Sequence, residues 1–374
     1  MEMEARKEND LTFSYSVVRP LKKISQNTWY VTEKGEKSNP EERLKISYDE
    51  IQSALSLMRK DKTIQMTPCD ESQLLRDKGF KIFLKKELHQ IMGSVKARGA
   101  VYSLLRLSNK QRKAVITTST GSFAHTLCHF GKEFGIPITV MIPLSEVVAE
   151  TIDTCLDLGA FVSIASYNIV EAHKEALRTA QENGLVYIDG NDHPNMIIGQ
   201  ATLGIEMMED KINAEAVILP TSINGCGLIT GIAMAIKGLN PNIKIIKVHS
   251  ARHDPFIKSI REETMCDYEI NTLEKEYGWH YDSDGIERSI FDMIVKVSDR
   301  SVKTAAKILL KGENIDDLSA AIGLAALSSG KLDELKGKRI IIPVFGKIDR
   351  LSNVKDNKTD DNPSSEPCAG PSNA

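Results

Sequence analysis

A lysine at the start of an expected helix is the first candidate for chemistry in this sequence. Residues 93–99 read Gly-Ser-Val-Lys-Ala-Arg-Gly and follow a short apolar run. A helix that begins near Ser94 would place Lys96 in its first turn, where free N–H groups and the helix dipole lower the pKa of an amine. Such an amine can form a Schiff base with a carbonyl group. Alternatively, Lys96 and Arg98 are solvated cations at a helix start, and this segment alone leaves both interpretations open.

Residues that carry hydroxyl groups precede the next expected helix. Residues 117–125 read Thr-Thr-Ser-Thr-Gly-Ser-Phe-Ala-His. The hydroxyl and backbone N–H groups of Ser119, Thr120 and Gly121 could bind a carboxylate. The same pattern also fits a serine or threonine N-cap beside a glycine turn, with no ligand.

A loop that contains glycines links another expected strand and helix. Residues 220–231 read Pro-Thr-Ser-Ile-Asn-Gly-Cys-Gly-Leu-Ile-Thr-Gly. The backbone N–H groups of such a loop can converge on a phosphate at the N-terminus of the following helix. The loop can equally be a tight turn without a ligand. Neither G-x-x-x-x-G-K nor G-x-G-x-x-G is present, which disfavours an unrelated nucleotide-binding protein.

Two further kinds of polar residue have simpler explanations. His125 and His129 lie four residues apart, as metal ligands on a helix can, but no third ligand or H-E-x-x-H pattern accompanies them. We therefore predict ordinary helix residues and no metal site. Glu206 is interpreted as a domain-interface or helix-surface charge rather than a general base.

Short apolar runs that alternate with helical patterns must position these residues. Strands are expected at residues 80–85, 114–118, 138–142, 161–165, 216–220, 243–249 and 339–344, and helical patterns at residues 124–134, 198–208 and 228–238. The alternation predicts a two-lobed α/β fold with predominantly parallel, twisted sheets and flanking helices.

The distribution of these elements also predicts domains. Residues 111–190 form β-α units of their own, which indicates a small α/β domain inserted into a large domain built from residues 45–110 and 191–350. Residues 1–44 form an N-terminal extension. Residues 351–374 are polar and lack an apolar period, so they cannot offset the entropy of ordering and are expected to be disordered.

The composition excludes several classes of protein. The chain has 374 residues with 48 Lys and Arg against 51 Asp and Glu, a formal net charge of −3, so no nucleic-acid partner is expected. Its apolar runs are far shorter than the ~20 residues that span a bilayer, so no membrane association is expected. The N-terminus lacks a targeting signal, and the 6 cysteines form no C-x-x-C pair, which favours free thiols in the cytoplasm.

The order of these motifs resembles the fold-type II pyridoxal-phosphate enzymes of the tryptophan synthase beta-like superfamily. Within it, the chain is most similar to the threonine/serine dehydratase and serine racemase branch. The resemblance covers roughly residues 45–350 and includes residues 198–206 and 345–349. It implies pyridoxal 5'-phosphate as cofactor, a small amino acid as substrate, and a homo-oligomer, most simply a dimer.

The resemblance also implies a role for each candidate residue. Lys96 would form the Schiff base with the cofactor, and Ser119, Thr120 and Gly121 would bind the substrate carboxylate. Thr120 would also be catalytic, because racemases carry there a serine that acts on the face opposite the lysine. The remaining cofactor contacts would be Ser122, Asn224, Gly225, Cys226, Gly227, Leu228 and Val344.

Three positions depart from the family pattern. Ser122 replaces an asparagine that contacts the 3-oxygen of the cofactor, and residues 224–227 include Asn and Cys where the family has glycines. Val344 replaces a serine or cysteine that faces the pyridine nitrogen. In addition, His249 replaces an acidic residue of the racemase metal site.

Two interpretations of function follow from the resemblance and these departures. The resemblance implies an L-serine or L-threonine ammonia-lyase that yields a 2-oxo acid and ammonia. The departures keep open a catalytically silent homologue with a binding or regulatory role, and a serine racemase is the other alternative.

Overall fold

The structure, a computed structural model, describes residues 21–25, 28–31, 45–191, 193–221, 227–250 and 290–346. The α-helices are Tyr48–Lys60 (α1), Lys96–Leu105 (α2), Ser122–Phe134 (α3), Ala149–Asp157 (α4), Ile169–Asn183 (α5), Pro194–Glu209 (α6), Gly227–Leu239 (α7), Asp299–Glu313 (α11) and Leu318–Ser328 (α12). The strands are Leu21–Ser25 (β1), Thr28–Val31 (β2), Lys45–Ser47 (β3), Cys69–Ser72 (β4), Lys81–Lys86 (β5), Val115–Thr118 (β6), Ile138–Ile142 (β7), Phe161–Ile164 (β8), Val186–Tyr187 (β9), Ala216–Pro220 (β10), Lys244–Ser250 (β11), Met293–Val297 (β12) and Arg339–Val344 (β13).

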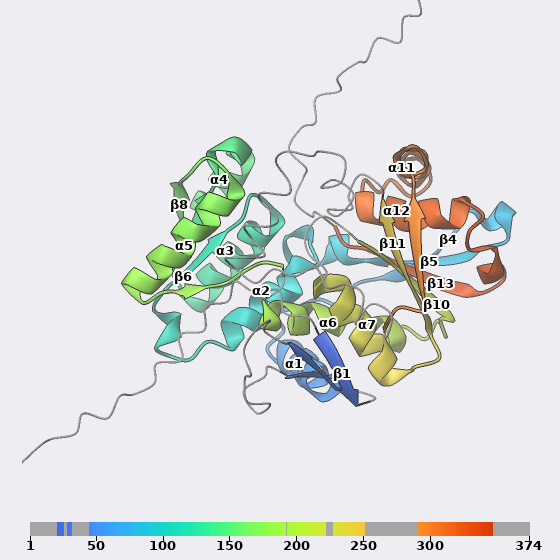
Figure 1. Ribbon diagram of the computed structural model, residues 1–374, viewed down its shortest axis with the longest axis horizontal. Coiled ribbons are helices and arrows are strands. Elements are labelled where there is room, and N and C mark those ends of the chain that lie inside the picture. Colours follow the sequence, from blue (N-terminus) through green and yellow to red (C-terminus); the bar gives the residue numbers. More distant parts are fainter. Residues whose placement is uncertain are drawn as a thin grey trace, which may run out of the picture.

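A six-stranded sheet forms the centre of the larger lobe, on the right in Figure 1. Its strand order is β12-β11-β10-β13-β5-β4, and every pair is parallel except β4 with β5. All five residues of β10 are buried, as expected for a central strand with helices on both faces.

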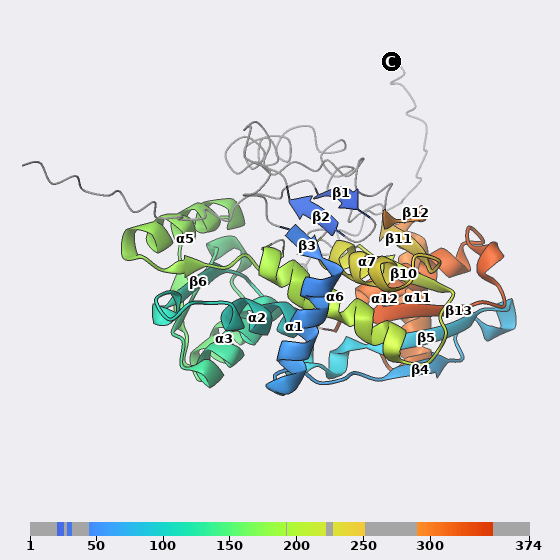
Figure 2. The ribbon, with the colours of Figure 1, turned by 90° about the horizontal axis from the view of Figure 1, so that it is seen from below.

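Alternate residues of β13 face opposite layers of helices. Ile342 and Val344 belong to a buried apolar cluster with residues of α11 and α12. Ile341, and Phe345 just after the strand, belong to the cluster that includes residues of α1, α2, α6 and α7. This period of two follows from the pleat of a strand. Figure 2 shows α1, α6 and α7 together on one side of β10 and β13.

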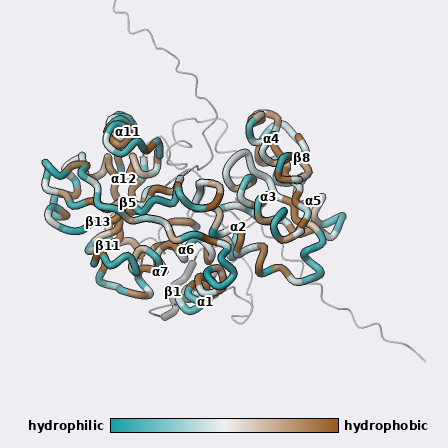
Figure 3. Tube along the Cα trace, turned by 180° about the vertical axis from the view of Figure 1, so that it is seen from behind, coloured by the Kyte–Doolittle hydropathy of each residue, from teal (hydrophilic) through white to brown (hydrophobic). Residues whose placement is uncertain are grey.

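A second sheet forms the smaller lobe, on the left in Figure 1. Its strands are parallel, in the order β8-β7-β6-β9, and α3, α4 and α5 pack against it. All its strands fall between residues 115 and 187, inside the range predicted for the inserted domain, whose limits stay a prediction. In Figure 3 the apolar residues gather along the strands and the polar ones on the outer helices.

The predicted fold class is confirmed, and each predicted strand limit lies within one residue of a strand in the structure. Strands β4, β9 and β12 of these two sheets were not predicted. The sequence of β4, Cys-Asp-Glu-Ser, has no apolar period, and its pairing with β5 holds it in place. A third, antiparallel sheet, β1-β2-β3, includes two strands within the predicted N-terminal extension. The predicted disordered tail lies outside the described residues.

Two other sequence predictions concern the cysteines and membrane-spanning segments. Cys69, Cys128 and Cys155 are free thiols. Within the described ranges, no helix has the length and apolar character that crossing a bilayer requires.

Candidate active site

Lys96 is the first residue of α2 and is buried, with 1% of its surface exposed. Its Nζ donates hydrogen bonds to the backbone oxygen of Gly190, at 2.6 Å, and to Oδ1 of Asn191, at 3.0 Å. Arg98 is fully buried on the same helix. The structure therefore excludes the interpretation of Lys96 and Arg98 as solvated cations.

The end of β13 fixes the point at which α2 begins. The N–H of Val95 donates to the backbone oxygen of Phe345, at 3.0 Å, and Ser94 pairs with Gly346 in an isolated β-bridge. Oγ of Ser94 then accepts a hydrogen bond from the N–H of Lys96, at 3.2 Å. Gly346 has φ of +84°, and a Cβ there would lie 2.1 Å from the backbone oxygen of Gly93, so only glycine fits this junction.

Ser122 connects the smaller lobe to the turn that precedes Lys96. It is the first residue of α3 and is buried, and its Oγ accepts a hydrogen bond from Oγ of Ser94, at 3.4 Å. Ser94 therefore contacts both Ser122 and the backbone of Lys96. Ser122 and Lys96, two predicted site residues, are therefore linked through Ser94.

Ser119 closes the loop before α3. Its Oγ accepts hydrogen bonds from the N–H groups of Gly121, at 3.4 Å, and Ala124, at 3.3 Å. The N-cap residue of α3 is Gly121 rather than a serine or threonine, so the simpler interpretation of the sequence is met only in that Ser119, two residues earlier, accepts these bonds. Binding of a carboxylate by Ser119 and Gly121 stays a prediction.

Thr120 lies beside a carboxylate that the sequence did not single out. Its Oγ1 donates to Oε2 of Glu146, at 3.4 Å, and its backbone oxygen accepts from Oγ1 of Thr151, at 3.0 Å. Glu146 ends the short 3-10 helix Leu144–Glu146, just after β7. The contact places a carboxylate, a group that can accept a proton, beside the hydroxyl of Thr120. Its position at the carboxyl end of a parallel strand is the signal that could have identified Glu146.

Gly190 and Asn191 were also missed, although they follow β9 at the same edge of the sheet. The N–H of Asn191 donates to Oδ1 of Asp189, at 2.9 Å, which orders this turn. The ring of Phe123 packs against Gly190 so closely that a Cβ at residue 190 would lie 2.2 Å from a ring carbon. The turn therefore presents two oxygen atoms to Lys96.

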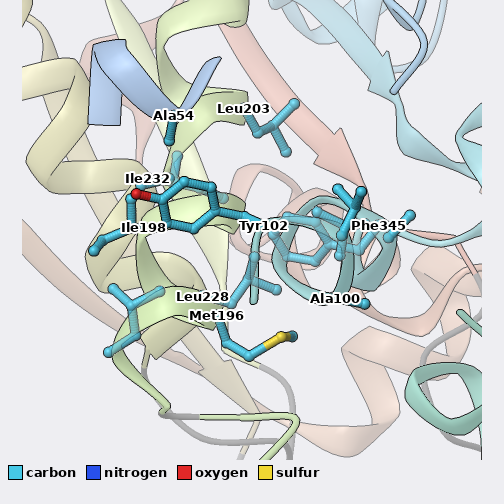
Figure 4. Close-up of a cluster of buried hydrophobic side chains, with 14 of the residues drawn as sticks. Ala54, Ala100, Tyr102, Met196, Ile198, Leu203, Leu228, Ile232 and Phe345 are labelled. Atoms are coloured by element: carbon cyan, nitrogen blue, oxygen red, sulfur yellow. The ribbon is translucent and has the colours of Figure 1, made fainter. Parts of the chain in front are cut away.

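The predicted phosphate loop is only partly described. Asn224, Gly225 and Cys226 lie outside the described residues, whereas Gly227 is the first residue of α7. Leu228 is buried in the cluster that also contains Met196, as Figure 4 shows. Any contact of Leu228 with a phosphate would therefore involve its backbone N–H rather than its side chain.

Val344 offers an apolar side chain at the position predicted to face the pyridine nitrogen. It is fully buried in the cluster with α11 and α12, whereas Phe345 packs on the other face, in the same cluster as Ala100. Figure 4 shows Phe345 near Ala100 of α2. Neither Val344 nor the next residue, Phe345, therefore offers a polar side chain to the pyridine nitrogen.

Buried charged side chains next to α2, the helix that carries Lys96, form a network. Arg98 donates to both oxygens of Glu87, at 2.8 Å each, and to Glu206, at 2.9 Å, and Lys85 pairs with Glu206 and Asp210, at 2.9 Å each. Burial alone would lower the pKa of Arg98, but these carboxylates hold it above its usual value. Burial likewise opposes ionisation of Glu206, yet Arg98 and Lys85 lower its pKa.

The interpretation of Glu206 as a domain-interface or helix-surface charge is therefore wrong. Its side chain is fully buried and forms ion pairs with Arg98 and Lys85. This network joins β5, α2 and α6 around the helix that carries Lys96.

Two groups of the protein suit two parts of pyridoxal phosphate, its aldehyde carbon and its phosphate. The buried amine of Lys96 suits the aldehyde carbon, and the N-terminus of α7 at Gly227 suits the phosphate group. The hydroxyl of Ser122 is available close to the lysine turn. Val344 offers the ring nitrogen no hydrogen bond.

Comparisons with known proteins agree with this assignment. The family model "Pyridoxal-phosphate dependent enzyme" matches residues 60–346. The L-threonine ammonia-lyase of Thermotoga maritima is 32% identical over 295 residues, which cover 74% of this chain and 70% of that protein.

Solved structures show the same fold. Maize serine racemase has a TM-score of 0.67 with 26% identity, covering 80% of this chain and 92% of that one. The processed threonine deaminase isoform 2 of Solanum lycopersicum has a TM-score of 0.68 with 23% identity, covering 86% and 88%. The chain belongs to the family of pyridoxal-phosphate dependent enzymes, and pyridoxal phosphate is its cofactor.

Proposed function

We propose that this protein is an ammonia-lyase that converts L-serine or L-threonine to a 2-oxo acid and ammonia. The observation that carries the proposal is the buried amine of Lys96, held by Gly190 and Asn191. The names of the relatives, L-threonine ammonia-lyase and threonine deaminase, support this substrate class. The sequence also predicts a cytoplasmic homo-oligomer, and both properties stay predictions.

Each site residue has a role in this proposal. Bound pyridoxal phosphate withdraws electrons from the Cα atom of an amino acid joined to it. Lys96 would hold the cofactor and move the Cα proton at its Nζ. The turn from Ser119 to Gly121 would orient the substrate carboxylate, and the hydroxyl of Ser122 would face the cofactor. Asn224, Gly225, Cys226 and the backbone N–H groups of Gly227 and Leu228 would bind the phosphate.

An absorption spectrum with borohydride labelling tests the proposal. The protein with added pyridoxal phosphate should show a visible band that borohydride removes, and peptide mass analysis should find the cofactor on Lys96. Lys96→Ala should abolish the band and the formation of 2-oxo acid. Lys307→Ala, at an exposed lysine of α11, is the matched control and should change neither. A protein that stays colourless overturns the proposal.

Serine racemisation is the second candidate, because Thr120 carries a hydroxyl where racemases carry a serine, and this hydroxyl donates to the carboxylate of Glu146. In deuterated water, a racemase would incorporate deuterium at Cα of both serine isomers. Thr120→Ala should then lose exchange with one isomer, whereas Thr120→Ser retains it. Formation of 2-oxo acid without any racemisation rejects this candidate.

A catalytically silent homologue is the third candidate, and the apolar environment of Val344 favours it. It predicts a protein that binds pyridoxal phosphate at Lys96 but yields no 2-oxo acid from either amino acid, even at high protein concentration. Detectable turnover by the unmodified protein rejects it.

A further inference from the structure

A buried threonine directly after β10 has no partner for its hydroxyl. Thr221 is 4% exposed, and its N–H donates to the backbone oxygen of Val248, at 2.7 Å, which continues the ladder between β10 and β11. Among the residues that the structure describes, Oγ1 of Thr221 has no hydrogen-bond partner. A buried hydroxyl is rarely left unpaired, because it has lost its bonds to water. The hydroxyl of Thr221 is therefore available to a ligand.

The period of two along β10 shows which face of the sheet carries Thr221. The first and third residues of β10 belong to the cluster with α11 and α12, whereas the second and fourth belong to the cluster with α1, α2, α6 and α7. Continued to residue 221, this alternation places Thr221 on the second face. That face holds α2, the helix that begins at Lys96. Phe345 lies on the same face, whereas Val344 lies on the opposite one.

The register of the sheet places Thr221 beside the position predicted to face the pyridine nitrogen. Strands β10 and β13 are parallel neighbours, and residue 216 pairs with residue 340. The same register sets Thr221 beside Phe345, one residue after Val344. Because neighbouring strands lie about 4.8 Å apart, a side chain at the end of β10 can reach a group that binds at the end of β13.

The carboxyl ends of β10 and β13 lie at the edge of the sheet that carries the lysine. The backbone oxygen of Phe345 accepts from the N–H of Val95, which precedes Lys96. Pro220 and Pro343, near the two carboxyl ends, have no N–H to donate to a ladder. Ligands of open α/β sheets bind outside the carboxyl ends of the strands. We therefore expect the cofactor at this edge.

A buried carboxylate at this edge already has partners. Asp317, the N-cap residue of α12, accepts hydrogen bonds from the N–H groups of Ala320 and Gly346, at 2.8 Å each, and from Oγ of Ser319. These bonds also occupy the hydroxyl of Ser319. The hydroxyl of Thr221, in contrast, has no competing partner among the described residues.

We propose that the hydroxyl of Thr221 donates a hydrogen bond to the pyridine nitrogen of bound pyridoxal phosphate. This nitrogen lies across the ring from the carbon that carries the aldehyde, so a group other than Lys96 must meet it. An unprotonated pyridine nitrogen accepts a hydrogen bond, and a hydroxyl can donate one. Thr221 on β10 thus replaces the contact that Val344 on β13 cannot make. The inference rests on the predicted place of the nitrogen near residue 344, and it holds whichever reaction the protein catalyses.

Titration of the cofactor-free full chain with pyridoxal phosphate, followed by the visible band, tests this contact. Thr221→Val keeps the shape of the side chain but removes the hydroxyl, and it should weaken binding about tenfold. Thr221→Ser keeps the hydroxyl and should bind as the wild type does. Ser103→Ala is the matched control, because it removes another buried hydroxyl that has no partner among the described residues, and it should leave binding unchanged. Equal affinities of the wild type and Thr221→Val overturn the proposal.

An analogue of the cofactor identifies the atom that the hydroxyl contacts. 1-Deazapyridoxal 5'-phosphate carries a C–H group in place of the ring nitrogen and keeps the aldehyde and the phosphate. The wild type and Thr221→Val should bind this analogue equally. If Thr221→Val binds the analogue about tenfold more weakly than the wild type does, the hydroxyl contacts another part of the cofactor, and the proposal is wrong.

Stability separates a contact with the cofactor from a structural role. Because Oγ1 of Thr221 has no partner among the described residues, cofactor-free Thr221→Val should unfold in urea at the midpoint of the wild type or above it. A lower midpoint would show that the hydroxyl stabilises the protein itself, which overturns the proposal. None of these measurements uses turnover, so their failure would leave the proposed ammonia-lyase activity standing, and absence of that activity would leave this contact standing.

Discussion

Lys96 is positioned by both lobes of the molecule. Its N–H donates to Ser94, and the N–H of the preceding Val95 donates to Phe345 at the end of a strand of the larger sheet. Its amine donates to Gly190 and Asn191 after β9 of the smaller sheet. Displacement of either lobe would therefore change the contacts of the amine. The two oxygen atoms to which the amine donates belong to a backbone carbonyl and a side-chain amide, and neither carries a formal charge.

Replacement of Asn191 tests this electrostatic role. Asn191→Asp places a carboxylate about where Oδ1 now lies, 3.0 Å from Nζ, and stabilises the protonated amine. We expect the pH at which Lys96 reacts with pyridoxal phosphate to rise by about one to three units, measured by spectral titration. Asn183→Asp, which makes the same charge change at an exposed site in α5, should leave the titration unchanged. An unshifted curve for Asn191→Asp would contradict this role.

His193 makes the stability of the fold sensitive to acid. Its Nδ1 accepts from the N–H of Asn195 at the start of α6, at 3.2 Å, and burial lowers its pKa to about 4, from 6.5 when unfolded. Between these values the unfolded chain binds the proton more strongly, so stability falls as the pH falls. This histidine should account for a loss of about 2 kcal/mol between about pH 7.5 and about pH 5.

His193→Asn keeps an N-cap acceptor but cannot titrate. Urea unfolding at the two pH values should show a correspondingly smaller acid loss than in the wild type. An identical acid loss in the two proteins would exclude His193 as its source.

At the scale of elements, α2 and α6 cross closely at a glycine. A Cβ on Gly199 would lie 2.4 Å from the backbone oxygen of Arg98 and 2.8 Å from Cα of Gly99. Since backbone atoms cannot rotate away as side chains do, Gly199→Ala must push α6 away from the helix that carries Lys96. We expect a loss of about 1–3 kcal/mol in the free energy of unfolding, together with weaker labelling of Lys96 by pyridoxal phosphate and borohydride.

Gly312→Ala is the matched control for that change. Gly312 lies in α11, and its added methyl would meet only Leu74, whose Cδ2 lies 2.6 Å away at the end of a flexible side chain. Because alanine favours a helix by up to about 1 kcal/mol over glycine, this variant should be as stable as the wild type or more so. Equal losses in the free energy of unfolding of both variants would contradict the close α2–α6 crossing as the cause of the loss in Gly199→Ala.

The sequence predicts elements best where burial alone determines them. Both limits of β10 and β13 were predicted, because nearly every residue of these strands is buried and apolar. The polar edge strand β4 was missed, since its pairing with β5 depends on a partner distant in sequence. Glu146 and Asn191 were missed for a related reason: their contacts with Thr120 and Lys96 arise only when separate strand ends meet.

At the scale of the whole molecule, one buried network holds the parts of the larger lobe around the site. Glu87 and Lys85 come from the segment at β5, Arg98 from α2, and Glu206 from α6. Each charge is compensated only while all three elements stay in place. The network therefore makes the position of α2, and with it Lys96, depend on the folding of the lobe as a unit.

Removal of Arg98 should therefore affect the entire lobe. Arg98→Met fills a similar volume but leaves Glu87 and Glu206 buried without their main counter-charge, at an expected cost of about 3–5 kcal/mol in the free energy of unfolding. Arg178→Met removes the partner of Glu175 and Glu182 on the surface of α5 and should leave the unfolding midpoint unchanged. Urea unfolding followed by circular dichroism measures both variants. If Arg98→Met unfolds at the same urea concentration as Arg178→Met, the network does not stabilise the lobe.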